Sequence, residues 1–155
     1  MEFPRGRLDL YLTEIGEPAD NDLRIVVLQA DARGPIESTE VGEARRIMPA
    51  EASPAIELVW YDYVAYAMRS ESYARLEDEE PLSKDSFTVK YDSAFLTYVR
   101  ASTFATDEFP GPLTHWSLDT LNHCLDVVST SPPEVRVLDV AERPRGPTSQ
   151  NWAKN

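Results

Sequence analysis

The sequence predicts an α+β protein, built mainly on an antiparallel sheet of about seven to eight strands, open or barrel-like, with one principal helix. Short segments that alternate apolar and polar residues recur between turns rich in glycine, proline, asparagine and aspartate, while a single segment has helical spacing. At 155 residues the chain fits one domain. We expect residues 1–142 to form it, and residues 143–155, which have no period, to be a mobile tail.

The first half of the chain begins with two predicted strands. The stretch "RLDLYLTE" (7–14) alternates leucine with polar residues, and "LRIVVLQAD" (23–31) is rich in β-branched residues. Between them, "IGEPADND" (15–22) has the composition of a turn. Residues 32–55 contain three prolines and two glycines, so we expect a loop with a short helix near residues 38–47.

The segment "AIELVWYDYVAYAMRSESY" (55–73) has apolar residues on both faces if it is extended. This pattern predicts either one long central strand or two strands bent at Asp62. The following stretch, "RLEDEEPLSKD" (75–85), contains four consecutive acids that repel one another. We expect it to be a solvated loop.

A strand, a helix and a second break follow. "SFTVKYD" (86–92) predicts a strand, after which Asp92 or Ser93 can cap a helix over "AFLTYVRASTF" (94–104). The inward side of this helix is predicted to carry Phe95, Leu96, Val99 and Thr103. "TDEFPGPL" ends the helix, because it places two prolines around a glycine. "EVRVLDV" (134–140) predicts the last strand.

The stretch "LTHWSLDTLNHCLDVVST" (113–130) contains both histidines and the only cysteine. Its residues favour strands over helix, most simply a hairpin that turns at residues 121–123. His115 and His123 would then be far apart, and even a helix would separate them by a rise of about 12 Å. They cannot share one metal ion, and no ligand pair has a zinc spacing, so we expect no metal and no other cofactor. Cys124 is expected to be buried and inert, because a neighbouring histidine on a strand faces the other way.

The charge balance restricts the partners. Twenty-seven acids against fifteen bases give a formal charge of −12, which disfavours nucleic acid and anionic membranes and would suit a basic protein. Solubility alone is the alternative explanation of this charge. No apolar run is long enough to cross a membrane, no signal segment is recognisable, and one cysteine cannot form an internal disulfide. We therefore expect a cytoplasmic protein, which the excess of arginine over lysine suggests is bacterial, with its oligomeric state open between monomer and homodimer.

Two hypotheses of function follow from these observations. The first is a non-catalytic acidic binding protein that engages a basic partner, and its candidate surface consists of Glu77, Asp78, Glu79 and Glu80. The second is a small-ligand-binding protein or enzyme with an aromatic pocket; its candidate residues are His115, Asp62, Trp60, Tyr63, Tyr66 and Trp116. No nucleophile elbow, phosphate-binding glycine loop or zinc motif is present, so no residue is marked as catalytic, which favours the first hypothesis.

Three segments carry a resemblance. At "VAYAMRSESYA", "FLTYVRASTFATDEFPGPLTHW" and "LNHCLDVVSTSPPEV", about half of the chain resembles a group of small uncharacterised bacterial proteins. By analogy, the resemblance implies an immunity partner of a bacterial toxin. Asn122 and His123 have a structural explanation as turn residues, as does Asp126 as a local hydrogen-bond acceptor.

Overall fold

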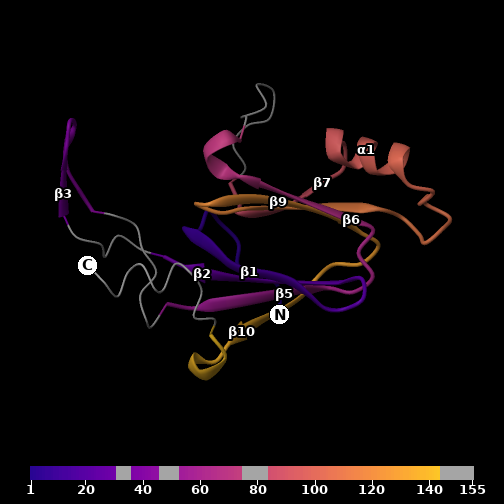
Figure 1. Ribbon diagram of the computed structural model, residues 1–155, viewed down its shortest axis with the longest axis horizontal. Helices are drawn as coiled ribbons and strands as arrows, with labels where there is room; N and C mark the ends of the chain where they lie inside the picture. The colour runs from indigo at the N-terminus through magenta and orange to yellow at the C-terminus, as the bar shows by residue number, and fades with distance from the viewer. Residues whose placement is uncertain (31–35, 46–52, 75–83, 144–155) are drawn as a thin grey trace.

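The computed structural model describes residues 1–30, 36–45, 53–74 and 84–143, and shows two four-stranded antiparallel sheets stacked face to face (Figure 1). The first sheet has the order β1 (Leu10–Ala19), β2 (Asp22–Gln29), β5 (Ala55–Trp60), β10 (Glu134–Leu138). The second has the order β6 (Ala65–Ser70), β9 (His123–Ser129), β8 (Thr114–Asp119), β7 (Phe87–Lys90). The helix α1 (Ala94–Ser102) covers the outer face of the second sheet, and a hairpin of β3 (Ile36–Thr39) and β4 (Gly42–Arg45) projects from one end. Two 3₁₀ turns, Glu71–Tyr73 and Val140–Glu142, complete the described elements.

The α+β class, the antiparallel pairing and the single helix are confirmed for the described residues. The predicted number of strands is wrong, because these residues form ten strands in three sheets, not a single barrel. No helix in this part of the chain has both the length and the apolarity needed to span a membrane. Of the predicted tail only Arg143 is described, and the acidic segment 77–80 lies outside the described residues.

The helix predicted near residues 38–47 is also wrong. Residues 36–45 form the β3–β4 hairpin, in which Thr39 pairs with Gly42 across a two-residue turn. Gly42 has a φ of 122°, a conformation that glycine adopts without strain and that no helix contains. The Thr39 hydroxyl donates a 2.6 Å hydrogen bond to the Gly42 carbonyl and closes the turn.

Two alternatives that the sequence left open are now decided. Residues 55–70 form two strands that belong to different sheets, and Asp62 lies in the turn between them with a φ of 52°. Residues 114–129 form a hairpin, as predicted, with its turn at residues 120–122. Each strand of this hairpin therefore turns alternate residues toward the first sheet and toward α1.

The core lies between the two sheets. It contains Leu23, Ile25, Leu58 and Trp60 from the first sheet, with Leu118, Leu125 and Val127 from the second. Each large side chain that is fully removed from water contributes about 1.5–3 kcal/mol to folding, so this layer supplies the main driving force. A smaller cluster lies on the other side of the second sheet, where Leu96 and Val99 of α1 pack against Val128.

The helix begins as the sequence predicts. Ser93 is its N-cap, and the Ser93 Oγ accepts a 3.0 Å hydrogen bond from the Leu96 amide. Leu96 and Val99 are buried, and Phe95 is half-buried beside them. The inward side predicted for these three residues is confirmed, but it is wrong for Thr103, which is exposed at the end of the helix. The cap therefore fixes the N-terminal end of α1, where the chain arrives from β7.

One asparagine joins the two sheets at the hairpin turn. The Asn122 Oδ1 accepts a 3.0 Å hydrogen bond from the Leu12 amide, and its Nδ2 donates one of 3.0 Å to the Leu12 carbonyl. The amide side chain thus pairs with β1 as a neighbouring strand would. The pairing between β1 and β2 is irregular just after Leu12, so this contact supports β1 where its own ladder is disturbed.

We expect Asn122→Ala to lower the free energy of unfolding by about 1–3 kcal/mol, because it leaves both backbone groups of Leu12 without their partner. Urea denaturation followed by fluorescence measures this difference. Leu121→Ala is the matched control, since Leu121 is part of the same turn but bonds the Leu10 carbonyl through its backbone amide. Equal stability of the Asn122 variant and the wild type would contradict the assignment.

Candidate functional site

The outer face of the second sheet carries a row of polar side chains. In β8 and β9, Ser117 lies opposite Asp126, and His115 is two residues before Ser117, opposite Val128. Lys90 of β7 lies opposite His115. Because side chains alternate along each strand, all four residues share the face that α1 partly covers. The apolar residues that alternate with them along the same strands, such as Leu118 and Leu125, face the core.

Asp126 is the centre of this row and is buried, with 5% of its surface exposed. The Asp126 Oδ1 accepts hydrogen bonds from His115 Nε2 at 2.9 Å and from the Ser117 hydroxyl at 3.3 Å. Its Oδ2 accepts one from Arg69 Nη2 at 2.9 Å. Burial raises the pKa of Asp126, but the His115 hydrogen bond and the nearby positive charges outweigh it, so the pKa is lowered. The ionised carboxylate can only accept, which places a proton on His115 Nε2.

Ser93 lies on the other side of the imidazole. The Ser93 Oγ is 2.7 Å from His115 Nδ1. In a neutral ring with its proton on Nε2, Nδ1 is an acceptor, and the serine hydroxyl donates to it. The Phe95 ring packs edge-on against the imidazole at a centroid distance of 5.4 Å. Ser93, His115 and Asp126 therefore form a continuous hydrogen-bonded chain.

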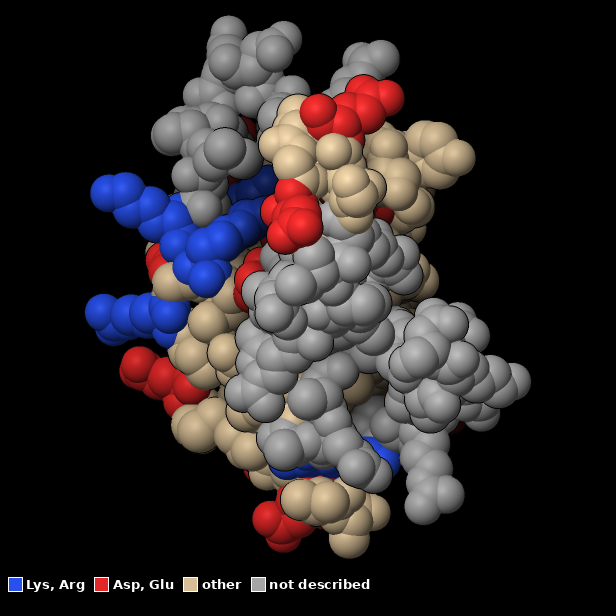
Figure 2. Space-filling model, turned by 90° about the vertical axis from the view of Figure 1, so that its left-hand side faces the viewer, with Lys and Arg blue, Asp and Glu red and all other residues tan. Residues whose placement is uncertain are grey.

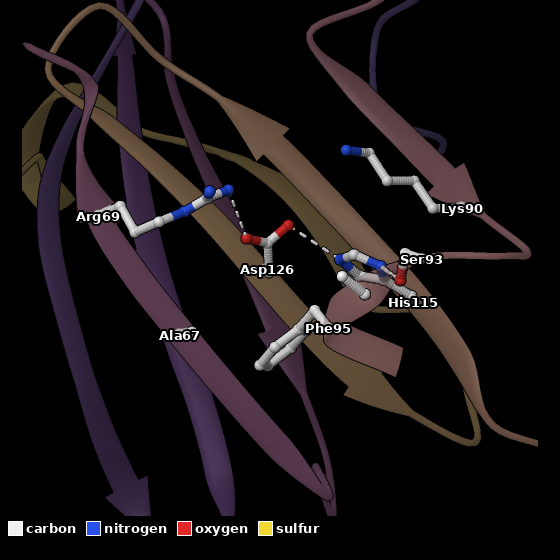
Figure 3. Close-up of a pocket in the computed structure, with 8 residues that line it drawn as sticks. Ala67, Arg69, Lys90, Ser93, Phe95, His115 and Asp126 are labelled. Atoms are coloured by element: carbon white, nitrogen blue, oxygen red, sulfur yellow. Dashed lines mark hydrogen bonds and ion pairs between the residues drawn. The ribbon is translucent and has the colours of Figure 1, made fainter. Parts of the chain in front are cut away.

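These three hydrogen-bonded residues form one wall of a pocket of about 200 Å³ between β6, β7 and the start of α1 (Figure 3). Arg69 and Lys90 lie on opposite sides of it, with Asp126 and His115 between them. Phe95 stands on a third side, and Ala67 leaves space because its side chain is small. The lining residues are Ala67, Arg69, Lys90, Ser93, Ala94, Phe95, His115 and Asp126.

Of the six residues of the predicted aromatic pocket, only His115 lines this one. Trp60 is buried between the sheets, and Trp116 packs against the same core on the opposite face of β8 from His115. Tyr63 and Tyr66 contact each other edge-to-face at 5.2 Å, and Asp62 is exposed in its turn. The sequence interpretation missed Arg69, Lys90 and Asp126 as site residues, and it assigned Ser93 only as a cap.

Three further predictions from the sequence concern an acidic surface, a metal site and Cys124. The candidate acidic surface at residues 77–80 lies outside the described residues. In the view of Figure 2, Lys and Arg side chains gather along one edge beside Asp and Glu side chains. The described residues contain no cluster of three or more histidine, cysteine or acidic side chains that could hold a metal ion. Cys124 is half-buried, and burial is the main cause that raises the pKa of its thiol.

Comparison of the chain with protein-family models, curated proteins and solved structures gives no match. The resemblance noted from the sequence therefore stays a prediction.

Asp126→Asn tests the charge at the centre of the site. Because the folded pKa lies below the usual value near 3.8, the carboxylate stabilises the fold above that value, and this contribution is lost as the pH falls through the folded pKa. We expect the variant to be less stable than the wild type at neutral pH, and the difference to shrink in acid. Denaturation curves from about pH 7 to about pH 2.5 measure it; a difference that is constant with pH would contradict the assignment.

Proposed function

We propose that the protein binds a small anionic ligand, with a carboxylate or phosphate group, in the pocket between Arg69, Lys90 and the start of α1. The observation that carries the proposal is the charge of the pocket. In a chain with a formal charge of −12, two cationic side chains and one carboxylate, Asp126, line the same small cavity. One of the three lysines in the sequence is among them.

The guanidinium of Arg69 is already oriented for such a ligand. One of its guanidinium nitrogens donates to Asp126, while 56% of the side chain remains exposed to solvent. A guanidinium has five N–H donors in a fixed plane, and it suits carboxylate and phosphate groups. Because Asp126 orients this plane before a ligand arrives, less conformational entropy is lost on binding.

The start of α1 adds a second source of positive potential. The first amides of a helix have no partner within the helix, and the helix dipole favours an anion at this end. Ala94 and Phe95, the first two helical residues, both line the pocket. A volume of about 200 Å³ corresponds to roughly six or seven water molecules at ~30 Å³ each, so it accommodates a small ligand or the anionic head of a larger one.

Calorimetric titration with inorganic phosphate and with acetate tests the proposal. We expect Arg69→Gln and Lys90→Gln each to weaken binding about tenfold, which equals about 1.4 kcal/mol, and sodium chloride to weaken it further. Arg100→Gln is the matched control, because Arg100 lies in the last turn of α1 and pairs with Asp107 at 3.3 Å. No binding to the wild type, or equal binding by all the variants, would contradict the proposal.

A second candidate function is the acidic binding protein that engages a basic protein partner, as a toxin inhibitor does. It is supported by the net charge and by an exposed aromatic pair, Phe104 and Phe109, whose rings stack at 6.3 Å beside Asp107 and Glu108. Exposed aromatic residues are frequent anchors of interfaces. A pull-down at low salt should retain a basic protein with the wild type and lose it with both phenylalanines changed to alanine; retention by the variant would contradict this surface.

A further inference from the structure

We infer that Ser93 is a nucleophile activated by His115, and that the pocket carries out acyl transfer from an ester. The inference deepens the proposed function: the ester would carry its anionic group toward Arg69 and Lys90. The roles of Ser93 and His115 do not depend on where the anionic group of the ester binds. What carries the inference is the unbroken chain from the Ser93 hydroxyl through the imidazole to Asp126.

The three residues have the geometry that nucleophilic catalysis requires. The hydroxyl is 2.7 Å from one ring nitrogen, and the carboxylate is 2.9 Å from the other. These are the distances expected between a nucleophile, its general base and the group that orients the base. The ring is turned relative to the Ser-His-Asp triad of proteases, where Nε2 faces the serine. Either nitrogen of an imidazole can accept the proton, so the turned ring retains the chemistry.

The position of Ser93 supplies stabilisation for developing charge. As the N-cap of α1 it lies at the positive end of the helix dipole, and its Oγ accepts the Leu96 N–H. Ala94 and Phe95, the first two helical residues, line the same pocket. Donors that are oriented before reaction favour the oxyanion formed when a hydroxyl attacks a carbonyl.

His115 is buried, and hydrogen bonds hold its ring on both sides. Only 1% of its surface is exposed, and Phe95 packs against the ring. Asp126 is a positioning residue, because it holds the Nε2 proton and thereby directs the Nδ1 lone pair to Ser93. Ser117 and Arg69 in turn hold the carboxylate in place.

The reaction that follows is balanced without any further reactant except water. The Ser93 Oγ forms a bond to the ester carbonyl carbon as its proton passes to His115 Nδ1. The tetrahedral intermediate then loses the alcohol, whose oxygen takes that proton as the C–O bond breaks. Water attacks the acyl-serine in the same way: its proton passes to Nδ1 and then returns to the Ser93 Oγ, and the carboxylic acid is released.

A fluorophosphonate probe tests the inference, because it forms a phosphorus–oxygen bond to an activated serine with loss of fluoride. We expect peptide mass spectrometry to locate the adduct at Ser93. His115→Gln should slow labelling by about 100-fold or more, the usual effect of a general base. Asp126→Asn should also slow labelling, because it removes the carboxylate that positions His115.

Ser93→Asn separates the nucleophile from the cap, since asparagine caps helices about as well as serine. This variant should keep the thermal midpoint of the wild type and lose all labelling, whereas Ser102→Ala, at the other end of α1, should label normally. Absence of an adduct on the folded wild type, an adduct elsewhere, or an unchanged rate in the His115 variant would each overturn the inference.

The outcomes also separate this inference from the proposed function. The probe is uncharged, so its reaction with Ser93 does not depend on anion binding, which calorimetry with inorganic phosphate measures separately. If phosphate binds at the pocket and Ser93 stays unlabelled, the inference fails while the proposed function stands. If Ser93 is labelled and phosphate does not bind, the anionic substrate class fails while the nucleophile stands.

Discussion

The buried carboxylate of Asp126 is the interaction on which the outer face of the second sheet depends. A carboxylate removed from water is strongly unfavourable unless charged or hydrogen-bonding groups surround it. Here Arg69 and His115 supply those groups from the two neighbouring strands. His115 then binds Ser93, and Ser93 begins α1, so one charge links three strands to the helix that covers them.

The two stacked sheets make this polar arrangement possible, because the apolar core between them does not need these polar side chains. Leu118 and Leu125 of the β8–β9 hairpin face the first sheet, and the same hairpin presents His115 and Asp126 on its other side. A fold stabilised by one face of a sheet can carry polar chemistry on the other face. The pocket therefore stands on strands, which position side chains more rigidly than loops do.

The elements with a clear local pattern could be predicted from the sequence. The poor helix formers in residues 113–130 predicted the hairpin, and Asp92 or Ser93 was predicted to cap α1 because a polar residue there precedes a helical period. Adjacent residues on a strand face opposite ways, so alternation alone could have separated His115 from Trp116 in the predicted pocket. The pairing of Arg69 with Asp126 could not be predicted, because it joins strands 57 residues apart whose order no local pattern reveals.

The protonation of the His115 ring tests the central claim most directly. In a ¹⁵N-labelled protein near pH 7.5, long-range ¹H–¹⁵N spectra distinguish a protonated ring nitrogen from an unprotonated one. We predict a neutral ring with its proton on Nε2, hydrogen-bonded to Asp126, and an unprotonated Nδ1 that accepts a hydrogen bond from Ser93. A ring protonated on both nitrogens, or only on Nδ1, would contradict the account, because Ser93 would then have no base.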